Sequence, residues 1–411
     1  MKSRVEQRLS AQYLRRVQAF RNGLIGRRDF LAISGAALAG LLGSAIVLGC
    51  GEPSLQPPPS PTPVEPDSAS ADGPLEDRPP LVEPLEDRPP LIEPLELSLP
   101  PAPLGTALVA LVRAGDVEAA VHKAIALAGG LDEIRSGQRV VIKPNLTGVG
   151  GNGRIYTSPD VLRAVIRAVK ERTAAANITV AEANAFNLST REWAQSTGVL
   201  AVIEDEGASF LAWEKEPYLR ARSQHFRHIP FELQVPRSLF DGSFAHFINL
   251  PILKNHEMVA GSNVDYTCCI KNHVGVIHPS NRFSGGKGIH EADLGERCAE
   301  LVLAVPRHAM NVVDGLSIVL TGGPAASNMQ IADAGLILAS KDPVACDSLA
   351  VAVLKRYARK LGIDRPYVNK SVWAQAQLQR ALQLNLGRPA GQCQVVAEGV
   401  DDAAEILAEW K

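Results

Sequence analysis

The sequence predicts an α/β fold, in which a mostly parallel sheet is covered by helices in a multi-layer arrangement. Short apolar runs alternate with longer segments of helical periodicity from residue 105 to residue 411. Runs such as Val140-Val141-Ile142 are apolar at consecutive positions, which is typical of parallel strands buried on both faces. Polar residues follow several of these runs, as expected at the sheet edge where α/β proteins bind ligands.

The first half of this domain has clear start and stop signals. Ser158-Pro159 is a favourable N-cap and first-turn pair for a helix. The segment 214–236 has no clear period, so we expect an irregular insert there, either a flap or an antiparallel unit. Strands are expected at 108–112, 139–142 and 178–181, and helices at 117–128 and 160–172.

The second half continues the same alternation. A strand at 244–250 should stop at Pro251, because proline cannot donate a hydrogen bond to a neighbouring strand. Residues 263–270 could form a helix, and Asp342 before Pro343 is expected to cap another. Further strands are expected at 309–313, 335–339 and 394–397, and further helices at 292–305, at 344–360 and at the C-terminus.

Residues 1–50 resemble an export signal. Residues 1–28 carry eight basic side chains against one acid, and Arg27-Arg28-Asp29-Phe30-Leu31 resembles a twin-arginine motif. The apolar run that follows ends in Leu48-Gly49-Cys50, which resembles a lipobox and predicts a lipidated Cys50. The alternative is an uncleaved transmembrane anchor, since about 20 apolar residues can span a bilayer. Both interpretations predict a chain that is exported across the cytoplasmic membrane and stays tethered to it.

A proline-rich linker is expected at 51–104. It contains 17 of the 29 prolines and has no helix or strand period, and the ten residues 74–83 recur almost unchanged as 84–93. Such chain is disordered but extended, at about 3.1 Å per residue. It can therefore hold the α/β domain of 105–411 away from its anchor, although a peptide motif for a recognition partner is an alternative.

Charge and cysteine content argue against two classes of function. Residues 1–50 have a net charge of +6 and the whole chain −2, so the remaining 361 residues carry −8. A mildly acidic domain is not expected to bind nucleic acid. Apart from Cys50, five cysteines remain without C-x-x-C spacing, so neither a disulfide framework nor a ferredoxin-type iron–sulfur cluster is expected.

Polar side chains stand at the ends of three predicted strands. Lys143 and Asn145 precede the glycine-rich segment 148–153, whose glycines do not open a helix directly, as a dinucleotide-binding fingerprint requires. We expect this segment to close over an anionic or polar ligand, with Lys143 as the charge. Glu182 could act as a base, ligate a metal or cap a helix. Asp314 is expected to end a later strand in the same site.

The stretch 246–290 concentrates five of the nine histidines and three lysines. Lys254 and His256 follow the strand that should stop at Pro251, and Lys271 and Asn272 come later. The lysines suit a ligand with carboxylate or phosphate groups. His256 and His290 could instead give neutral imidazole ligands to a divalent metal, although their spacing matches no standard zinc motif.

Several of these motifs occur in the order seen in the DUF362 family, a domain of unknown function. The resemblance covers residues 108–354. It implies that the motif residues form a site, without giving them roles. Members often carry a ferredoxin-like iron–sulfur module, but this chain lacks the cysteine spacing for one. The motifs are Lys143-Pro144-Asn145, Asn249-Leu250-Pro251, Lys254-x-His256, Lys271-Asn272-x-x-Gly275, Asp314-Gly315, Gly322-Gly323-Pro324 and Asp342-Pro343-x-Ala345-Cys346-Asp347.

The sequence therefore predicts an exported, membrane-tethered protein that acts on an anionic small molecule. Redox chemistry, metal-assisted hydrolysis and isomerisation stay open, as do a divalent metal cofactor and a redox partner. The alternative is a non-catalytic ligand-binding or electron-transfer accessory lipoprotein, so whether the chain is an enzyme is left open. The expected catalytic residues are His256, Glu182 and Lys254, and the expected ligand-binding residues are Lys143, Asn145, Lys271, Asn272 and Asp314.

Overall fold

The computed structural model describes residues 93–147, 154–183, 189–257, 262–282, 288–291, 293–306, 308–323 and 329–411. The predicted signal with Cys50, most of the linker, the glycine-rich segment and Lys287 lie outside these residues. Within the described part of the chain, no helix combines the length and the apolar character that a bilayer span requires.

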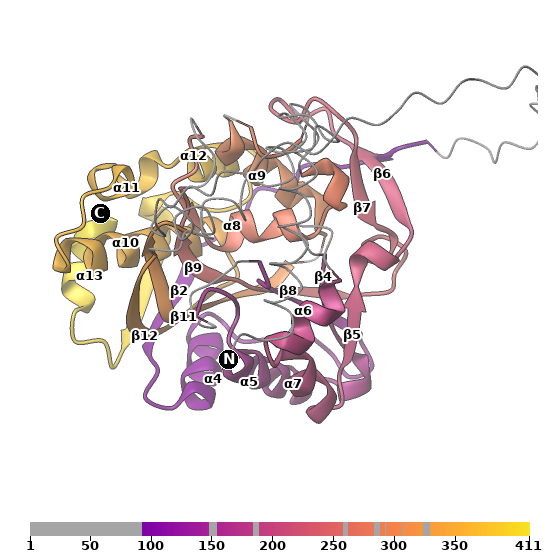
Figure 1. The fold of residues 1–411 in the computed structure, drawn as a ribbon, viewed down its shortest axis with the longest axis horizontal. Coiled ribbons are helices and arrows are strands. Elements are labelled where there is room, and N and C mark those ends of the chain that lie inside the picture. The colour runs from indigo at the N-terminus through magenta and orange to yellow at the C-terminus, as the bar shows by residue number, and fades with distance from the viewer. Residues whose placement is uncertain are drawn as a thin grey trace, which may run out of the picture.

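A mixed sheet of ten strands forms the middle layer (Figure 1). Its main path runs β13-β2-β12-β11-β8-β3-β4-β5, and β9 pairs with both β11 and β10. Most pairs are parallel, while β11–β12, β12–β2 and β9–β10 are antiparallel. The predicted α/β class with a mostly parallel sheet is confirmed. The strands are β2 Ala107–Arg113, β3 Val140–Pro144, β4 Ile178–Glu182, β5 Ser209–Ala212, β8 His246–Leu250, β9 Ile252–Asn255, β10 Tyr266–Thr267, β11 His308–Thr321, β12 Gln330–Ser340 and β13 Cys393–Glu398.

The insert is a separate small sheet. Strands β6 (Tyr218–Arg222) and β7 (Leu233–Pro236) pair antiparallel, so the antiparallel alternative for 214–236 is confirmed. Strand β1 (Leu95–Glu96), within the predicted linker, adds to β6 in parallel, and Leu97 beside it is buried.

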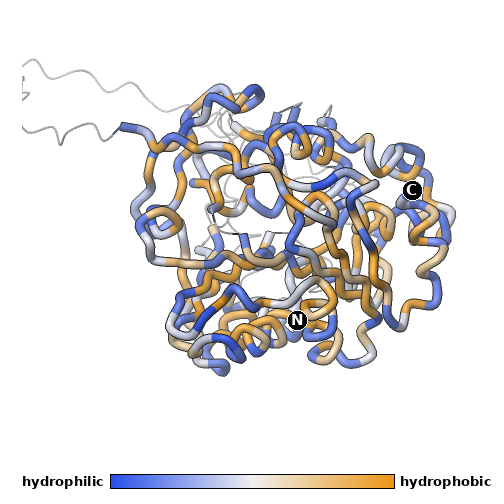
Figure 2. The backbone as a smooth tube through the Cα atoms, turned by 180° about the vertical axis from the view of Figure 1, so that it is seen from behind, coloured by the Kyte–Doolittle hydropathy of each residue, from blue (hydrophilic) through white to orange (hydrophobic). Residues whose placement is uncertain are grey.

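Helices cover both faces of the main sheet (Figure 1). On β2, Ala110 and Val112 pack with the helices α4, α5 and α7, whereas Val109 and Leu111 pack with α10 and its neighbours. The alternation of side chains along a strand thus divides the core into two layers, and the strands show mainly hydrophobic colour in Figure 2. The helices are α4 Val117–Leu127, α5 Pro159–Lys170, α6 Thr190–Ser196, α7 Val199–Asp205, α8 Cys269–Asn272, α9 Leu294–Leu301, α10 Pro343–Lys360, α11 Pro366–Asn369, α12 Ala376–Gln383 and α13 Ala403–Trp410.

Strand β8 ends at Leu250, before Pro251, as predicted. Lys254 was expected beyond the sheet edge, but β9 begins at Ile252 and contains it. Two further local predictions were wrong. The helix expected at 263–270 is replaced by β10 and by the short helix α8, since Tyr266 and Thr267 pair with β9. Asp314 does not end a strand, because β11 continues to Thr321.

Candidate functional site

The predicted strand-end residues lie side by side because their strands are neighbours. Parallel register places Lys143 of β3 opposite Asn249 of β8, and Asn249 opposite Asn311 of β11. Glu182 ends β4, the neighbour of β3 on the other side. The prediction that Lys143, Asn145 and Glu182 stand at carboxyl-terminal strand ends is therefore confirmed.

Asn272 of α8 joins these strand ends through its side-chain amide. Its Oδ1 accepts hydrogen bonds from Lys143 Nζ at 3.3 Å and from Asn145 Nδ2 at 2.9 Å. Its Nδ2 donates to Asn249 Oδ1 at 2.8 Å, and Asn249 in turn donates to Asn311 Oδ1 at 3.0 Å. All of these side chains are buried, so each amide has exchanged water for protein partners.

Lys143 and Glu182 form a buried ion pair. Lys143 Nζ lies 2.7 Å from Glu182 Oε2 and also donates to the Pro144 carbonyl at 2.9 Å. Burial lowers the pKa of Lys143 and raises the pKa of Glu182, while their mutual attraction opposes both shifts. Gly275 closes over the pair, since a Cβ there would lie 2.1 Å from Glu182 Oε1 and 2.5 Å from Lys143 Nζ.

Lys254 has a hydrogen-bond acceptor for each of its three ammonium protons. Its Nζ donates to Asn145 Oδ1 at 3.0 Å, to the Thr147 carbonyl at 2.7 Å and to the Ile155 carbonyl at 3.1 Å. Burial, followed by the charge of Lys271, lowers the pKa of Lys254 to about 7. These contacts hold Asn145 and the chain on both sides of the glycine-rich segment.

Lys271 and His256 differ from the other buried site residues because they have unused hydrogen-bonding capacity. Among the residues that the structure describes, no hydrogen bond or ion pair engages the Lys271 ammonium, although the residue is only 7% exposed. His256 Nδ1 is buried and likewise has no partner in the described chain. Burial, then Lys271, His290 and Lys254, hold the pKa of His256 well below its usual value, so its ring is neutral near pH 7.

His290 stands beside this pair. Its Nδ1 lies 3.0 Å from the Arg282 carbonyl, which places the ring proton on that nitrogen. Burial and the charge of Lys271 lower its pKa to about 3. In the described chain, neither His256 nor His290 belongs to a group of three converging metal-ligand side chains, so the histidine metal site remains a prediction.

Asp314 lies apart from the Asn272 network. Its Oδ2 accepts a hydrogen bond from Ser158 N at 2.7 Å, and its Oδ1 accepts one from Leu316 N at 3.1 Å. Burial raises its pKa to about 6. These contacts fasten the start of α5 to β11, and none of its described hydrogen bonds reaches the network.

The sequence interpretation missed three buried polar residues that shape the site. Asn249 was considered only as part of a strand-ending motif, and Asn311 was not considered as a site residue. Arg282 is 1% exposed, donates to the Ile277 carbonyl at 2.8 Å and acts electrostatically on Lys143 and Lys271. No pattern around Arg282 indicates a site, whereas an asparagine inside an apolar strand is a signal that could have found the other two.

The fold and this site define an α/β protein with a polar, cation-rich site at the carboxyl ends of its parallel strands. The chain belongs to the DUF362 family, described as a domain of unknown function, whose model matches residues 140–352. The matched region includes all the residues of the Asn272 network. A search of curated proteins finds no match.

Proposed function

We propose that the chain binds an anionic small molecule at this edge of the sheet, and that His256 exchanges a proton with the bound molecule. The observation that supports this most strongly is Lys271, which is 7% exposed and whose amine has no hydrogen-bond or ion-pair partner among the described residues. Burial lowers the pKa of Lys271, and pairing with an anion would stabilise its charged form in this setting. A carboxylate or phosphate group on a ligand would supply the missing partner.

The surrounding charges favour the same kind of ligand. Lys143, Lys254 and Arg282 are buried close enough to Lys271 or to one another to lower each other's pKa values. Glu182 acts on all three, but it already pairs with Lys143. Glu214 also acts on Arg282. The cations still outnumber these two carboxylates, and an anion would reduce the imbalance.

Proton exchange is assigned to His256 because it has a free ring nitrogen. A neutral imidazole can accept a proton from a bound molecule, and a nearby anion would stabilise the imidazolium that results. Lys254 and Glu182, the other two residues expected to be catalytic, are occupied by hydrogen bonds. We assign to Lys254 the positioning of Asn145, and to Glu182 the positioning of Lys143.

A divalent metal remains an optional partner in this proposal. His256 and His290 would be its imidazole ligands, and an anionic ligand between the metal and Lys271 would separate the positive charges. The proposal of anion binding does not depend on this metal. The same site could serve a non-catalytic binding protein, in which case His256 would only hold the ligand.

The proposed setting is the outer side of the cytoplasmic membrane. The twin-arginine-like motif, the lipobox-like end at Cys50 and the proline-rich linker support an exported domain on a long tether. Such a domain would meet small anions outside the cytoplasm.

Titration calorimetry tests the proposal with inorganic phosphate, pyrophosphate and citrate as probes. We expect at least one probe to bind the wild-type chain, and Lys271→Met to weaken binding at least about tenfold, or about 1.4 kcal/mol. The control is Lys355→Met, which removes another buried lysine that donates to the Lys370 carbonyl at 2.9 Å. Equal binding by Lys271→Met and the wild type would contradict the proposal.

Once a probe that binds is known, the variant His256→Gln distinguishes a catalytic function from a purely binding function. A positioning or binding role predicts a changed affinity with no change in the chemical fate of the molecule. A proton-transfer role predicts retained binding and a loss of turnover.

A further inference from the structure

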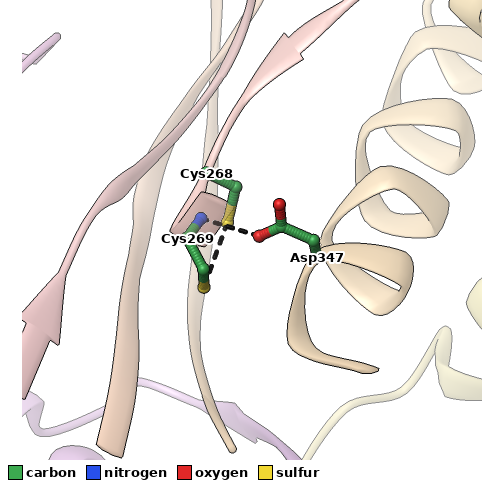
Figure 3. A group of neighbouring side chains, drawn as sticks. All are labelled: Cys268, Cys269 and Asp347. Atoms are coloured by element: carbon green, nitrogen blue, oxygen red, sulfur yellow. Dashed lines mark hydrogen bonds between the residues drawn. The ribbon is translucent and has the colours of Figure 1, made fainter. Parts of the chain in front are cut away.

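Three buried side chains with metal-binding atoms converge between the start of α8 and α10. Cys268 and Cys269 lie at the start of α8, and Asp347 projects towards them from α10 (Figure 3). Their ligand atoms all lie within 4.8 Å of one another, and each residue is 0% exposed. The site described above uses none of the three.

The separation of the two thiols suits a tetrahedral ion. Cys268 Sγ and Cys269 Sγ are 3.8 Å apart. In a tetrahedral zinc site the Zn–S bonds are about 2.3 Å long, which places two sulfur ligands about 3.8 Å from each other. The thiols therefore already stand at the spacing that a shared zinc ion imposes.

Asp347 has one coordination position left. Its Oδ2 accepts hydrogen bonds from Ile270 N and from the Tyr266 hydroxyl, at 3.2 and 3.1 Å. Its Oδ1 accepts Cys269 N at 2.7 Å. The Cys268 and Cys269 thiols also hydrogen-bond to this carboxylate, and zinc would take the place of their protons. A carboxylate oxygen has two lone pairs, so Oδ1 can bind an ion and keep the hydrogen bond from Cys269 N.

Cys346 stands next to this group without belonging to it. It precedes Asp347 on α10, is fully buried, and its side chain contributes to the raised pKa of the Cys269 thiol, but its sulfur is not among the converging ligand atoms. The remaining two described cysteines stand farther from the group. Cys298 acts on Lys271 and Asp347 from α9, while Cys393 is only half-buried and bonds to backbone carbonyls.

We propose that Cys268, Cys269 and Asp347 are the protein ligands of a structural zinc site that fastens α8 to α10. Zinc would replace the protons of Cys268 and Cys269, and these protons would pass to solvent. The two thiolates neutralise the Zn²⁺ charge, and the single remaining negative charge of the Asp347 carboxylate is stabilised by the N–H groups of Cys269 and Ile270. Because α8 carries Lys271 and Asn272, the ion would fix the helix on which the anion site is built. The zinc proposal does not rest on anion binding.

The test is metal analysis of the full chain, purified without chelator from cells grown with zinc. We expect about one zinc ion per chain. The double variant Cys268→Ala/Cys269→Ala should lose most of it, and the matched control Cys393→Ala should keep it. Zinc retained by the double variant would overturn the proposal.

A second measurement decides the matter if the double variant does not fold. The wild-type chain is unfolded, stripped of metal and refolded with Co²⁺, which replaces zinc and absorbs in the near ultraviolet when thiolates bind it. We expect this thiolate absorption, together with a higher melting temperature for the cobalt-loaded chain than for the metal-free chain. The control Cys393→Ala should show both effects. A wild-type chain that holds no stoichiometric zinc and develops no cobalt–thiolate absorption would overturn it.

Discussion

Asn272 contacts the ends of two strands with one side chain. Its amide bonds to Lys143, Asn145 and Asn249, which stand on or beside β3 and β8. A buried amide that loses one partner leaves the others unsatisfied, at a cost of about 1–3 kcal/mol for each such group. At the residue scale, the network is therefore specific to asparagine, since aspartate lacks the donor that Asn249 needs.

The buried Lys143–Glu182 pair gives the first prediction. Glu182→Gln keeps the shape but leaves the Lys143 ammonium without a counter-charge, so the free energy of unfolding should fall by about 3 kcal/mol. Urea unfolding at neutral pH measures this. The control is Glu118→Gln, which removes a surface partner of Arg167 and should cost under about 1 kcal/mol. An equal loss in the free energy of unfolding for the two variants would contradict a charged Lys143–Glu182 pair in the folded protein.

Asp314 predicts a pH dependence of stability. Its pKa is raised by burial from 3.8 to about 6, so the folded state holds the proton that the unfolded state has already released. Its contribution to stability is complete below about pH 4 and is lost as the pH rises through 6. The loss is on the order of 3 kcal/mol, at 1.4 kcal/mol per pKa unit.

Asp314→Asn should remove this dependence. Urea unfolding of the variant and the wild type between pH 4 and pH 7 should show a difference that shifts in favour of the variant as the pH rises. The control is Asp132→Asn, a surface partner of Arg172, whose curve should follow that of the wild type. A difference that is constant over this range would contradict the raised pKa of Asp314.

The site residues that could be predicted from the sequence share one property. Each lies at the end of an apolar strand or directly after it. Lys143, Asn145 and Glu182 could be predicted because parallel strands end at a common edge. The unpaired state of Lys271 and His256 could not be predicted, since it depends on which side chains of other elements reach them. For the same reason, Asp314 was expected in the site although its backbone partners belong to α5 and β11.

At the scale of elements, α10 shows how a local sequence fixes a long helix. Asp342 at its N-cap accepts hydrogen bonds from Val344 N and Ala345 N, as the Asp342-Pro343 pair predicts, and it also pairs with Arg388. Gly387 lies so close that a Cβ there would stand 2.3 Å from Asp342 Oδ1. The cap therefore joins the start of α10 to the segment before β13.

Asp342→Ala should cost about 2–4 kcal/mol, because it removes a cap and leaves the Arg388 guanidinium without the counter-charge of Asp342. Thermal unfolding followed by circular dichroism measures the loss. The matched control is Asp116→Ala at the exposed N-cap of α4, where the side chain accepts only Ala119 N and about 1 kcal/mol is expected. A cost at Asp342 no larger than the one at Asp116 would mean that Arg388 adds nothing to the cap.

Elements with a strong period were predictable, and short ones that depend on pairing were not. Helix α5 and strand β4 follow their sequence signals closely. By contrast, β9 forms because it pairs with both β10 and β11. The residues around Pro251 do not predict these partners. Lys254 was therefore expected beyond a strand, whereas it lies within β9.

At the scale of the whole molecule, the last residues of the predicted linker are part of the fold. Strand β1 pairs with β6, and Leu97 after it is buried. The end of the proline-rich segment is thus attached to the small sheet.

The proposed anchor gives a prediction at this scale. The host should be a bacterium that has the twin-arginine export route and attaches lipid to exported proteins. In it, the wild-type chain should sediment with membranes, resist extraction by high salt and carry lipid on Cys50. Cys50→Ser should remove the lipid mass without changing the fold, which mass spectrometry and circular dichroism would check. A lipid-free wild-type chain in the membrane fraction would contradict the lipoprotein and favour the uncleaved anchor.

The central claim is that Lys271 and His256 hold an anion. Diffraction from crystals soaked in tungstate tests it most directly, because the anomalous scattering of tungsten locates the anion. The account predicts a peak within hydrogen-bonding distance of the Lys271 ammonium and next to the His256 ring, which should disappear in Lys271→Met. Tungstate found only at exposed side chains such as Lys123 would contradict it.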